Sequence, residues 1–170
     1  MKNPEEIKIL TDYVVRLSFE MKVLEAWRSW ANQSVSAGKE IGGAVLALKT
    51  PHTTNYKVLF STYETGDETS FRRESNIFYP QTIKFWYPDL KFDMSNIYFI
   101  GEFHTHLKTD NFSTVDLGYF KNAKGYPLFM FLVTQKGWRS AHKSPENIII
   151  TDLLEYEVGI NILRSRFTVY

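Results

Sequence analysis

The sequence predicts a single domain of the α+β or α/β class spanning residues 1–170. Runs of β-branched and aromatic residues, typical of strands, recur along the chain and alternate with segments of helical periodicity. The composition is that of a globular protein, with 44% hydrophobic and 23% charged residues. A chain of 170 residues is long enough to bury a substantial core.

The first quarter of the chain predicts a strand followed by a helix. The stretch "DYVVRLSF" at 12–19 has strand composition. We expect Ser18 to cap the helix, with Glu20 in its first turn. Helical spacing then relates Met21, Leu24, Trp27 and Ala31. The polar stretch 32–39 predicts the break before the next element.

The next segments predict a hairpin-like pair of strands at 40–50 and 56–63, joined by a turn within "TPHTTN". Residues 64–75 are polar and predict a loop. A short helix is expected within 80–90, with Pro80 in its first turn and Pro88 near its end.

The second half predicts strands around one short helix. The strand 96–106 ends in two histidines, and 113–125 has a serine cap and a glycine stop. The apolar run 126–135 predicts a central strand, which 137–142 continues after a turn. Segment 147–160 fits a strand or a helix, and Ile148 to Thr151 favour the strand.

Charge and cysteine content exclude several functions. The net charge is +1 and no long basic run occurs, so the footprint of a dedicated nucleic-acid binder is absent. The chain has no cysteine, which excludes disulfides, thiolate nucleophiles and the cysteine-bound zinc of cytidine deaminases. We find no signal peptide or membrane span and expect a soluble, cytoplasmic protein.

His104 and His106 suggest a metal site. Residues two apart in a strand share a face, and two neutral imidazoles suit zinc. On their own, such histidines are more commonly ordinary surface or core residues. Asp116 supplies a possible third ligand, because Ser113 and Asp116 would share one helix end. The same pair also fits a capping box with no metal.

Glu40 stands before Gly42 and Gly43, where an apolar strand begins. A carboxylate at this place needs a partner, and the paired glycines suggest close backbone approach. If the two strands are neighbours, Glu40 reaches a zinc-bound water as general base. The alternative is a solvated loop residue beside a glycine turn.

Together, a glutamate before a Gly-Gly strand, "GEFHTH" and Ser-x-x-Asp resemble the JAMM (MPN-plus) zinc metalloproteases, most closely their compact prokaryotic branch. The resemblance covers roughly residues 40–133. It implies an α+β fold of MPN type, a curved mixed β-sheet flanked by helices.

The resemblance also implies roles for individual residues. His104, His106 and Asp116 match the zinc ligands, Glu40 the general acid/base and Ser113 the oxyanion-stabilising hydroxyl. The implied reaction is hydrolysis of a peptide or isopeptide bond in a protein substrate. The implied partner is a ubiquitin-like modifier or its target, in a bacterial conjugation or anti-phage system.

Two departures from the family concern the loop after His106. Leu107 replaces the usual proline, and six residues, 107–112, precede Ser113, one fewer than is typical. The shorter loop either keeps Ser113 and Asp116 in place or moves Asp116 off the metal. In the second case Asp110 is the candidate to replace it.

Other polar and aromatic residues have weaker interpretations. Glu102 shares a strand face with the histidines. It either orients a ligand histidine or pairs with a neighbouring basic residue. His52 and His142 are expected at the surface, in polar turns. The aromatic segment 71–86 packs in the core or holds an extended peptide tail.

Two further functions compete with the protease. One is a non-catalytic MPN scaffold that binds a protein partner. The other is a RadC-like protein linked to DNA repair, which the balanced charge disfavours.

Overall fold

The structure is a computed structural model and describes residues 8–11, 13, 15–66, 84–89, 94–122, 128–156 and 167–169. In chain order the elements are β1 (Lys8–Ile9), β2 (Arg16–Phe19), α1 (Met21–Ala37), β3 (Ile41–Lys49), β4 (Asn55–Ser61), β5 (Glu64–Thr65), the 3₁₀ turn η1 (Met94–Asn96), β6 (Ile97–Thr105), α3 (Thr114–Asn122), β7 (Phe129–Val133), β8 (Trp138–Lys143), β9 (Ile148–Thr151) and β10 (Phe167–Val169).

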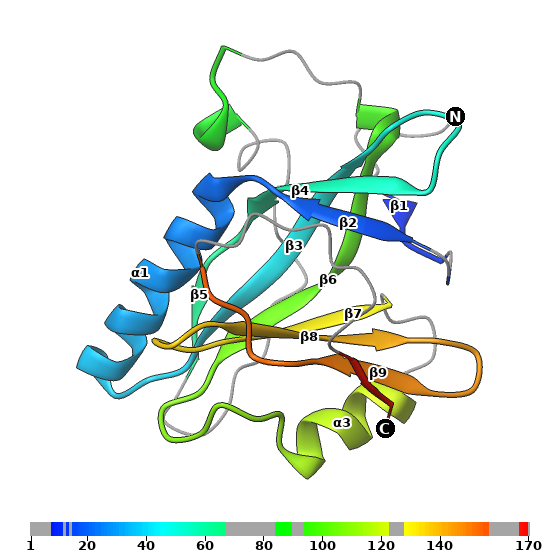
Figure 1. The fold of residues 1–170 in the computed structure, drawn as a ribbon. Coiled ribbons are helices and arrows are strands. Elements are labelled where there is room, and N and C mark those ends of the chain that lie inside the picture. The colour runs from blue at the N-terminus through cyan, green and yellow to red at the C-terminus, as the bar shows by residue number, and fades with distance from the viewer. Residues whose placement is uncertain are drawn as a thin grey trace.

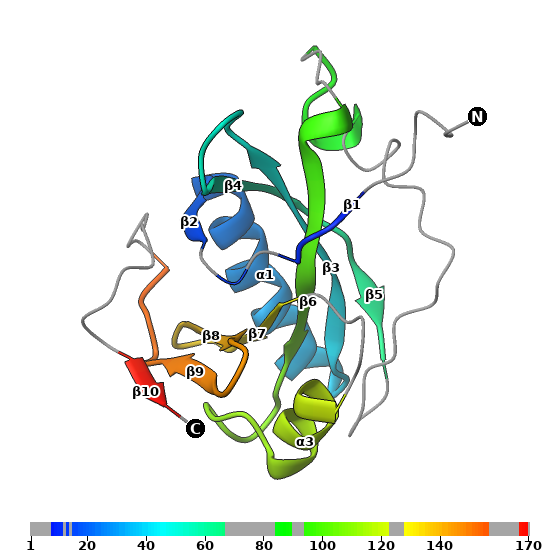
Figure 2. The ribbon, with the colours of Figure 1, turned by 90° about the vertical axis from the view of Figure 1, so that its right-hand side faces the viewer.

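The predicted α+β class is confirmed: one mixed sheet is flanked by helices (Figure 1). The main path of the sheet runs β10-β9-β8-β7-β6-β3-β4-β2, while β1 pairs with β6 and β5 with β3. The sheet curls, and α1 lies on its concave side (Figure 2). Strands β3 and β6 are central and antiparallel, so the glutamate and histidine segments are neighbours.

Helix α1 packs its apolar side into this concavity. Leu24, Trp27 and Ala31 are buried as their spacing predicts, but Met21 is 40% exposed. The Trp27 ring lies against Phe103 of β6 and Phe131 of β7, with centroids 5.5 and 5.4 Å apart. Such aromatic contacts fasten the helix to the middle of the sheet.

Both ends of α1 differ from the prediction. Ser18 lies in β2 opposite Lys57, and Glu20 takes the N-cap position without a side-chain cap bond. The polar stretch 32–39 does not break the helix, which continues to Ala37. Gly38, at φ 65°, ends it because glycine adopts the left-handed conformation without steric cost.

The two faces of the sheet carry different clusters. Phe129 and Phe131 of β7 join the core under α1, whereas Met130 packs with Leu117 and Phe120 of α3. Alternation along the strands therefore places α1 and α3 against opposite faces. The same alternation places neighbouring side chains at the end of β6 on opposite faces of the sheet.

The predicted hairpin and later strands are confirmed. β3 and β4 are antiparallel, and Ile148–Thr151 forms a strand, not a helix. Short strands β1, β5 and β10 were not predicted from the sequence; two- and three-residue strands are too short for a period of two to register. Of the expected 80–90 helix, residues 84–86 are helical, while Pro80 lies outside the described residues.

Most of the aromatic segment 71–86 also lies outside the described residues. Within its described end, Phe85 is 84% exposed and Trp86 packs partly against the core. None of the helices described is both long enough and apolar enough to cross a membrane.

Candidate metal centre

The end of β6 places neighbouring side chains on opposite faces of the sheet. Thr105 is fully buried on the α1 side, where it contacts Ser34. His104 therefore points to the α3 side, and His106, the first residue after the strand, points the same way. Their side chains are 13% and 12% exposed, so a small ligand can reach them.

Helix α3 supplies the carboxylate. The Ser113 backbone N–H donates to Asp116 Oδ2 at 2.9 Å, and the Asp116 N–H donates to Ser113 Oγ at 3.0 Å. This reciprocal capping box fixes the start of the helix. The capping box is therefore confirmed, and because the capped carboxylate also faces the histidines, Asp116 remains a possible metal ligand.

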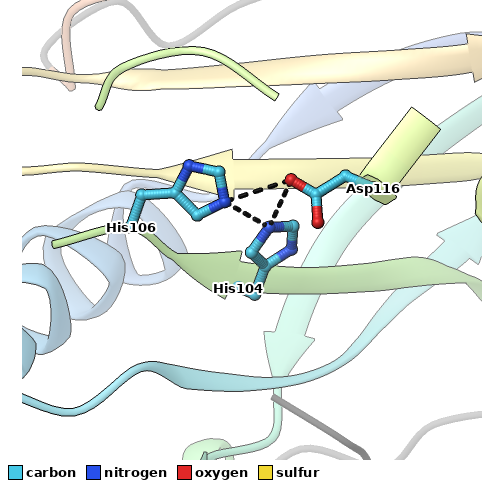
Figure 3. A group of neighbouring side chains, drawn as sticks. All are labelled: His104, His106 and Asp116. Atoms are coloured by element: carbon cyan, nitrogen blue, oxygen red, sulfur yellow. Dashed lines mark hydrogen bonds and ion pairs between the residues drawn. The ribbon is translucent and has the colours of Figure 1, made fainter. Parts of the chain in front are cut away.

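The three side chains form a compact triangle (Figure 3). The two Nε2 atoms are 3.0 Å apart, and Asp116 Oδ2 lies 3.3 Å from His104 Nε2 and 3.1 Å from His106 Nε2. A tetrahedral ion with bonds of about 2.1 Å needs ligand atoms roughly 3.4 Å apart. The triangle has about that size, so His104, His106 and Asp116 can hold one metal ion.

The side chains of the triangle stabilise one another's charged forms. Burial alone would raise the pKa of the Asp116 carboxyl, but hydrogen bonds from His104 and His106 hold it well below its usual range. The Ser113 N–H acts in the same direction. The carboxylate is therefore ionised throughout the physiological pH range, as a metal ligand must be.

The pKa of His106 moves the other way. Burial lowers it, but the hydrogen bond and charge of Asp116 outweigh burial and raise it. The charge of Glu40 and the backbone of Asn111 add to this increase. The environment thus favours a positive charge at the centre of the triangle, whether a proton or a metal ion supplies it.

The strand register places Glu40, the residue just before β3, next to the triangle. Gly42 of β3 pairs with His104 of β6, and continuing this antiparallel register by two residues brings Glu40 opposite His106. Directly opposed residues point to the same face. Glu40 is only 9% exposed, and its charge acts on His106. The sequence prediction that these segments converge is confirmed.

A chain of buried hydroxyls fixes the backbone on both sides of Glu40. Ser34 Oγ donates to the Lys39 carbonyl at 2.5 Å, and the Ile41 N–H donates to Thr105 Oγ1 at 2.9 Å. Ser34 Oγ and Thr105 Oγ1 lie 2.6 Å apart. Since the Ser34 proton goes to Lys39, Thr105 donates to Ser34. Sequence reasoning missed this chain, because its two hydroxyls are 71 residues apart.

Gly43 is required by close backbone approach. A Cβ there would lie 2.3 Å from the Thr62 carbonyl oxygen, a distance that no side chain tolerates. The Ala44 N–H donates to Thr62 Oγ1 at 2.7 Å, and Thr62 N–H donates back to the Ala44 carbonyl at 2.9 Å. The predicted reason for one glycine of the pair is therefore confirmed.

The shorter loop leaves Asp116, not Asp110, beside the histidines. Asp110 instead pairs with Lys136 Nζ at 3.2 Å, and its carbonyl accepts from Arg139 Nε at 2.6 Å. Asp110 does not belong to the group of possible ligands among the described residues. Glu102 lies on the histidine face of β6 and is partly buried.

The prediction for His142 was wrong. It lies in β8, not in a turn, and its ring stacks on Phe129 with centroids 4.3 Å apart. Burial lowers its pKa to about 4, so it is neutral at pH 7. His52 does lie in an exposed turn, with φ 61°.

Comparisons with known proteins give no name to this site. No family model matches the chain, and no curated protein matches it. The solution structure of protein DSY2949 from Desulfitobacterium hafniense aligns with 82% of this chain and 90% of its own, at 16% identity and a TM-score of 0.46. A functional proposal therefore rests on the site residues themselves.

Proposed function

We propose that this protein is a zinc-dependent hydrolase of peptide or isopeptide bonds, of the JAMM type that its motifs resemble. One observation carries the proposal: two imidazoles and a carboxylate converge within 3.3 Å, with the charge of Glu40 beside them. Two histidines and one carboxylate leave a zinc ion a position for water or substrate, as catalytic zinc sites do.

Zinc is favoured over harder cations by the donor set. Imidazole nitrogen suits zinc and other late transition metals, whereas magnesium and calcium prefer oxygen ligands. A bound zinc ion would supply Lewis acidity, which polarises a carbonyl and makes a water molecule acidic near neutral pH.

Glu40 and Ser113 would supply the proton transfers and the oxyanion donor of the reaction. Glu40 takes the proton of the attacking water and delivers it to the leaving amine. Ser113 Oγ accepts from the Asp116 N–H, which leaves its own proton to be donated to the oxyanion. Losing one such donor typically costs about 100- to 1000-fold in rate.

The substrate class follows from the family resemblance. We propose a protein tail, most specifically the C-terminal segment of a ubiquitin-like modifier joined to its target or to a precursor extension. In a bacterium, such an enzyme would serve a conjugation system, including one used in defence against phages.

A zinc-titrated hydrolysis assay tests this function. Linear and isopeptide-linked fusions of ubiquitin-like modifiers are incubated with the wild type, with Glu40→Gln and with Glu155→Gln, a matched change at an exposed residue. We expect Glu40→Gln to bind one zinc ion and to lose about 100- to 10,000-fold in turnover, whereas Glu155→Gln keeps wild-type rates.

Two results would contradict the proposal. The first is a wild-type protein that takes up no zinc at neutral pH. The second is a Glu40→Gln variant that cleaves as fast as its parent, because it would remove the general base from the mechanism.

A further inference from the structure

The loop 107–112 between His106 and the start of α3 is tied to the β7–β8 hairpin. Arg139 Nε donates to the Asp110 carbonyl at 2.6 Å, and Arg139 Nη1 donates to the Thr151 carbonyl at 3.3 Å. Lys136 Nζ adds an ion pair with the Asp110 carboxylate at 3.2 Å. These contacts hold the loop at a fixed place beside the metal centre.

Thr109 is the loop residue that reaches the centre. Its Oγ1 lies 3.2 Å from His106 Nδ1, on the side of the ring away from the triangle. The same Oγ1 donates to the Asn111 carbonyl at 3.1 Å. A hydroxyl has one proton to donate, and a carbonyl oxygen only accepts.

This arrangement decides which ring nitrogen of His106 is left for a metal ion. Because the Thr109 proton is given to Asn111, Thr109 Oγ1 meets the ring as an acceptor. His106 Nδ1 must then be the donor, so it bears the hydrogen. Nε2 is then the nitrogen left for a metal ion, and with no metal bound it donates to Asp116 Oδ2, 3.1 Å away.

We propose that Thr109 is a positioning residue whose hydroxyl accepts from His106 Nδ1–H and so presents Nε2 to the metal. The inference rests on the metal centre of the proposed function, but not on the reaction that the centre catalyses. An imidazole ligand generally uses one nitrogen for the metal and the other for such an orienting hydrogen bond.

The proposal also explains how a loop shorter than the family pattern still serves the site. With the loop held to the hairpin by Arg139, the Thr109 hydroxyl lies 3.2 Å from Nδ1 of the His106 ring, while Asp116 Oδ2 lies 3.1 Å from Nε2. Thr109 and Asp116 thus hold the ring from opposite edges.

The test compares full-length wild type with Thr109→Val, Thr109→Ser and the exposed-turn control Thr54→Val. Zinc affinity is measured by competition with a chromogenic chelator. We expect Thr109→Val, which has the shape of threonine without its hydroxyl, to bind zinc about 10- to 100-fold more weakly. Thr109→Ser and Thr54→Val should match the wild type.

A second measurement observes the His106 Nδ1 proton directly. Long-range proton–nitrogen NMR spectra of histidine-labelled, zinc-loaded protein are recorded, with His106→Ala for assignment. We expect His106 to bind zinc through Nε2 and to carry a slowly exchanging Nδ1–H in the wild type and in Thr109→Ser. In Thr109→Val we expect this proton to exchange with water faster, because its acceptor is gone.

Failure of this inference is distinguishable from failure of the proposed function. Unchanged zinc affinity or unchanged exchange of the Nδ1 proton in Thr109→Val, zinc bound through His106 Nδ1 in the wild type, or a wild type that binds no zinc overturns the role of Thr109. Weakened zinc binding together with faster exchange of the Nδ1 proton supports it, even if no peptide or isopeptide substrate is cleaved.

Discussion

Replacing Thr105 with valine should destabilise the protein without altering its shape. Thr105 is fully buried, and its Oγ1 bonds to the Ile41 N–H at 2.9 Å and to Ser34 Oγ at 2.6 Å. Valine fills the same volume, so no cavity forms. What is lost is the partner of a buried donor and one hydroxyl–hydroxyl bond.

The size of the effect follows from those two losses. A buried donor left without a partner costs about 1–3 kcal/mol, and the second bond contributes about 1 kcal/mol, which together give roughly 2–4 kcal/mol. For a chain of this length, each kcal/mol lowers Tm by about 2–4 °C. We therefore expect Thr105→Val to unfold roughly 4–16 °C below the wild type.

Urea titration and thermal scans measure this loss, with Thr54→Val as control within about 0.5 kcal/mol of wild type. A double-mutant cycle with Ser34→Ala should show a coupling of about 0.5–3 kcal/mol, because both changes remove the same bond. A Thr105→Val protein as stable as the wild type would refute the reasoning: the hydroxyl chain would then contribute nothing to the fold around Glu40.

Two further predictions concern protons and metal. Burial lowers the pKa of His142 from 6.5 to about 4. As the pH falls, the unfolded chain therefore takes up a proton on His142 before the folded protein does. The contribution of the neutral ring to the unfolding free energy is complete above pH 6.5, and up to about 3 kcal/mol of it is lost as the pH drops toward 4. Urea titrations across this range should show the loss in the wild type and a flatter profile in His142→Phe; parallel profiles would refute it. Zinc at about 100 times its Kd should raise the unfolding free energy by about 2.7 kcal/mol. A chelator or His104→Ala should abolish this gain in thermal scans, and an equal zinc response in His104→Ala would exclude His104 as a ligand.

Most regular elements could be predicted from local pattern. The alternation and apolar runs of β3, β6 and β7 arise from burial on a pleated sheet, so they are visible in the sequence. The extent of α1 was not, because in the mostly polar stretch 32–37 only Ser34 is buried, so no apolar periodicity marks the last turns of the helix. Ser34 looks like a breaker residue but is fully buried against Thr105.

The candidate ligands were visible for the same local reason. His104 and His106 stand two apart in a strand, and Ser113 and Asp116 stand three apart at a helix start. These spacings place each pair on one face or at one helix end whatever surrounds them. The choice between Asp116 and Asp110 was not local, since it depended on Arg139 and Lys136 holding the loop.

The sequence by itself therefore determined the kinds of side chain that could bind a metal and the elements that carry them. Only the tertiary structure decided that Glu40 faces His106, that Thr109 supports the ring, and that Thr105 and Ser34 fix the backbone beside Glu40. The physical reason is that spacing along one strand or helix follows from fixed backbone geometry. Contacts between residues far apart in the chain depend on strand register and on the packing of the whole core.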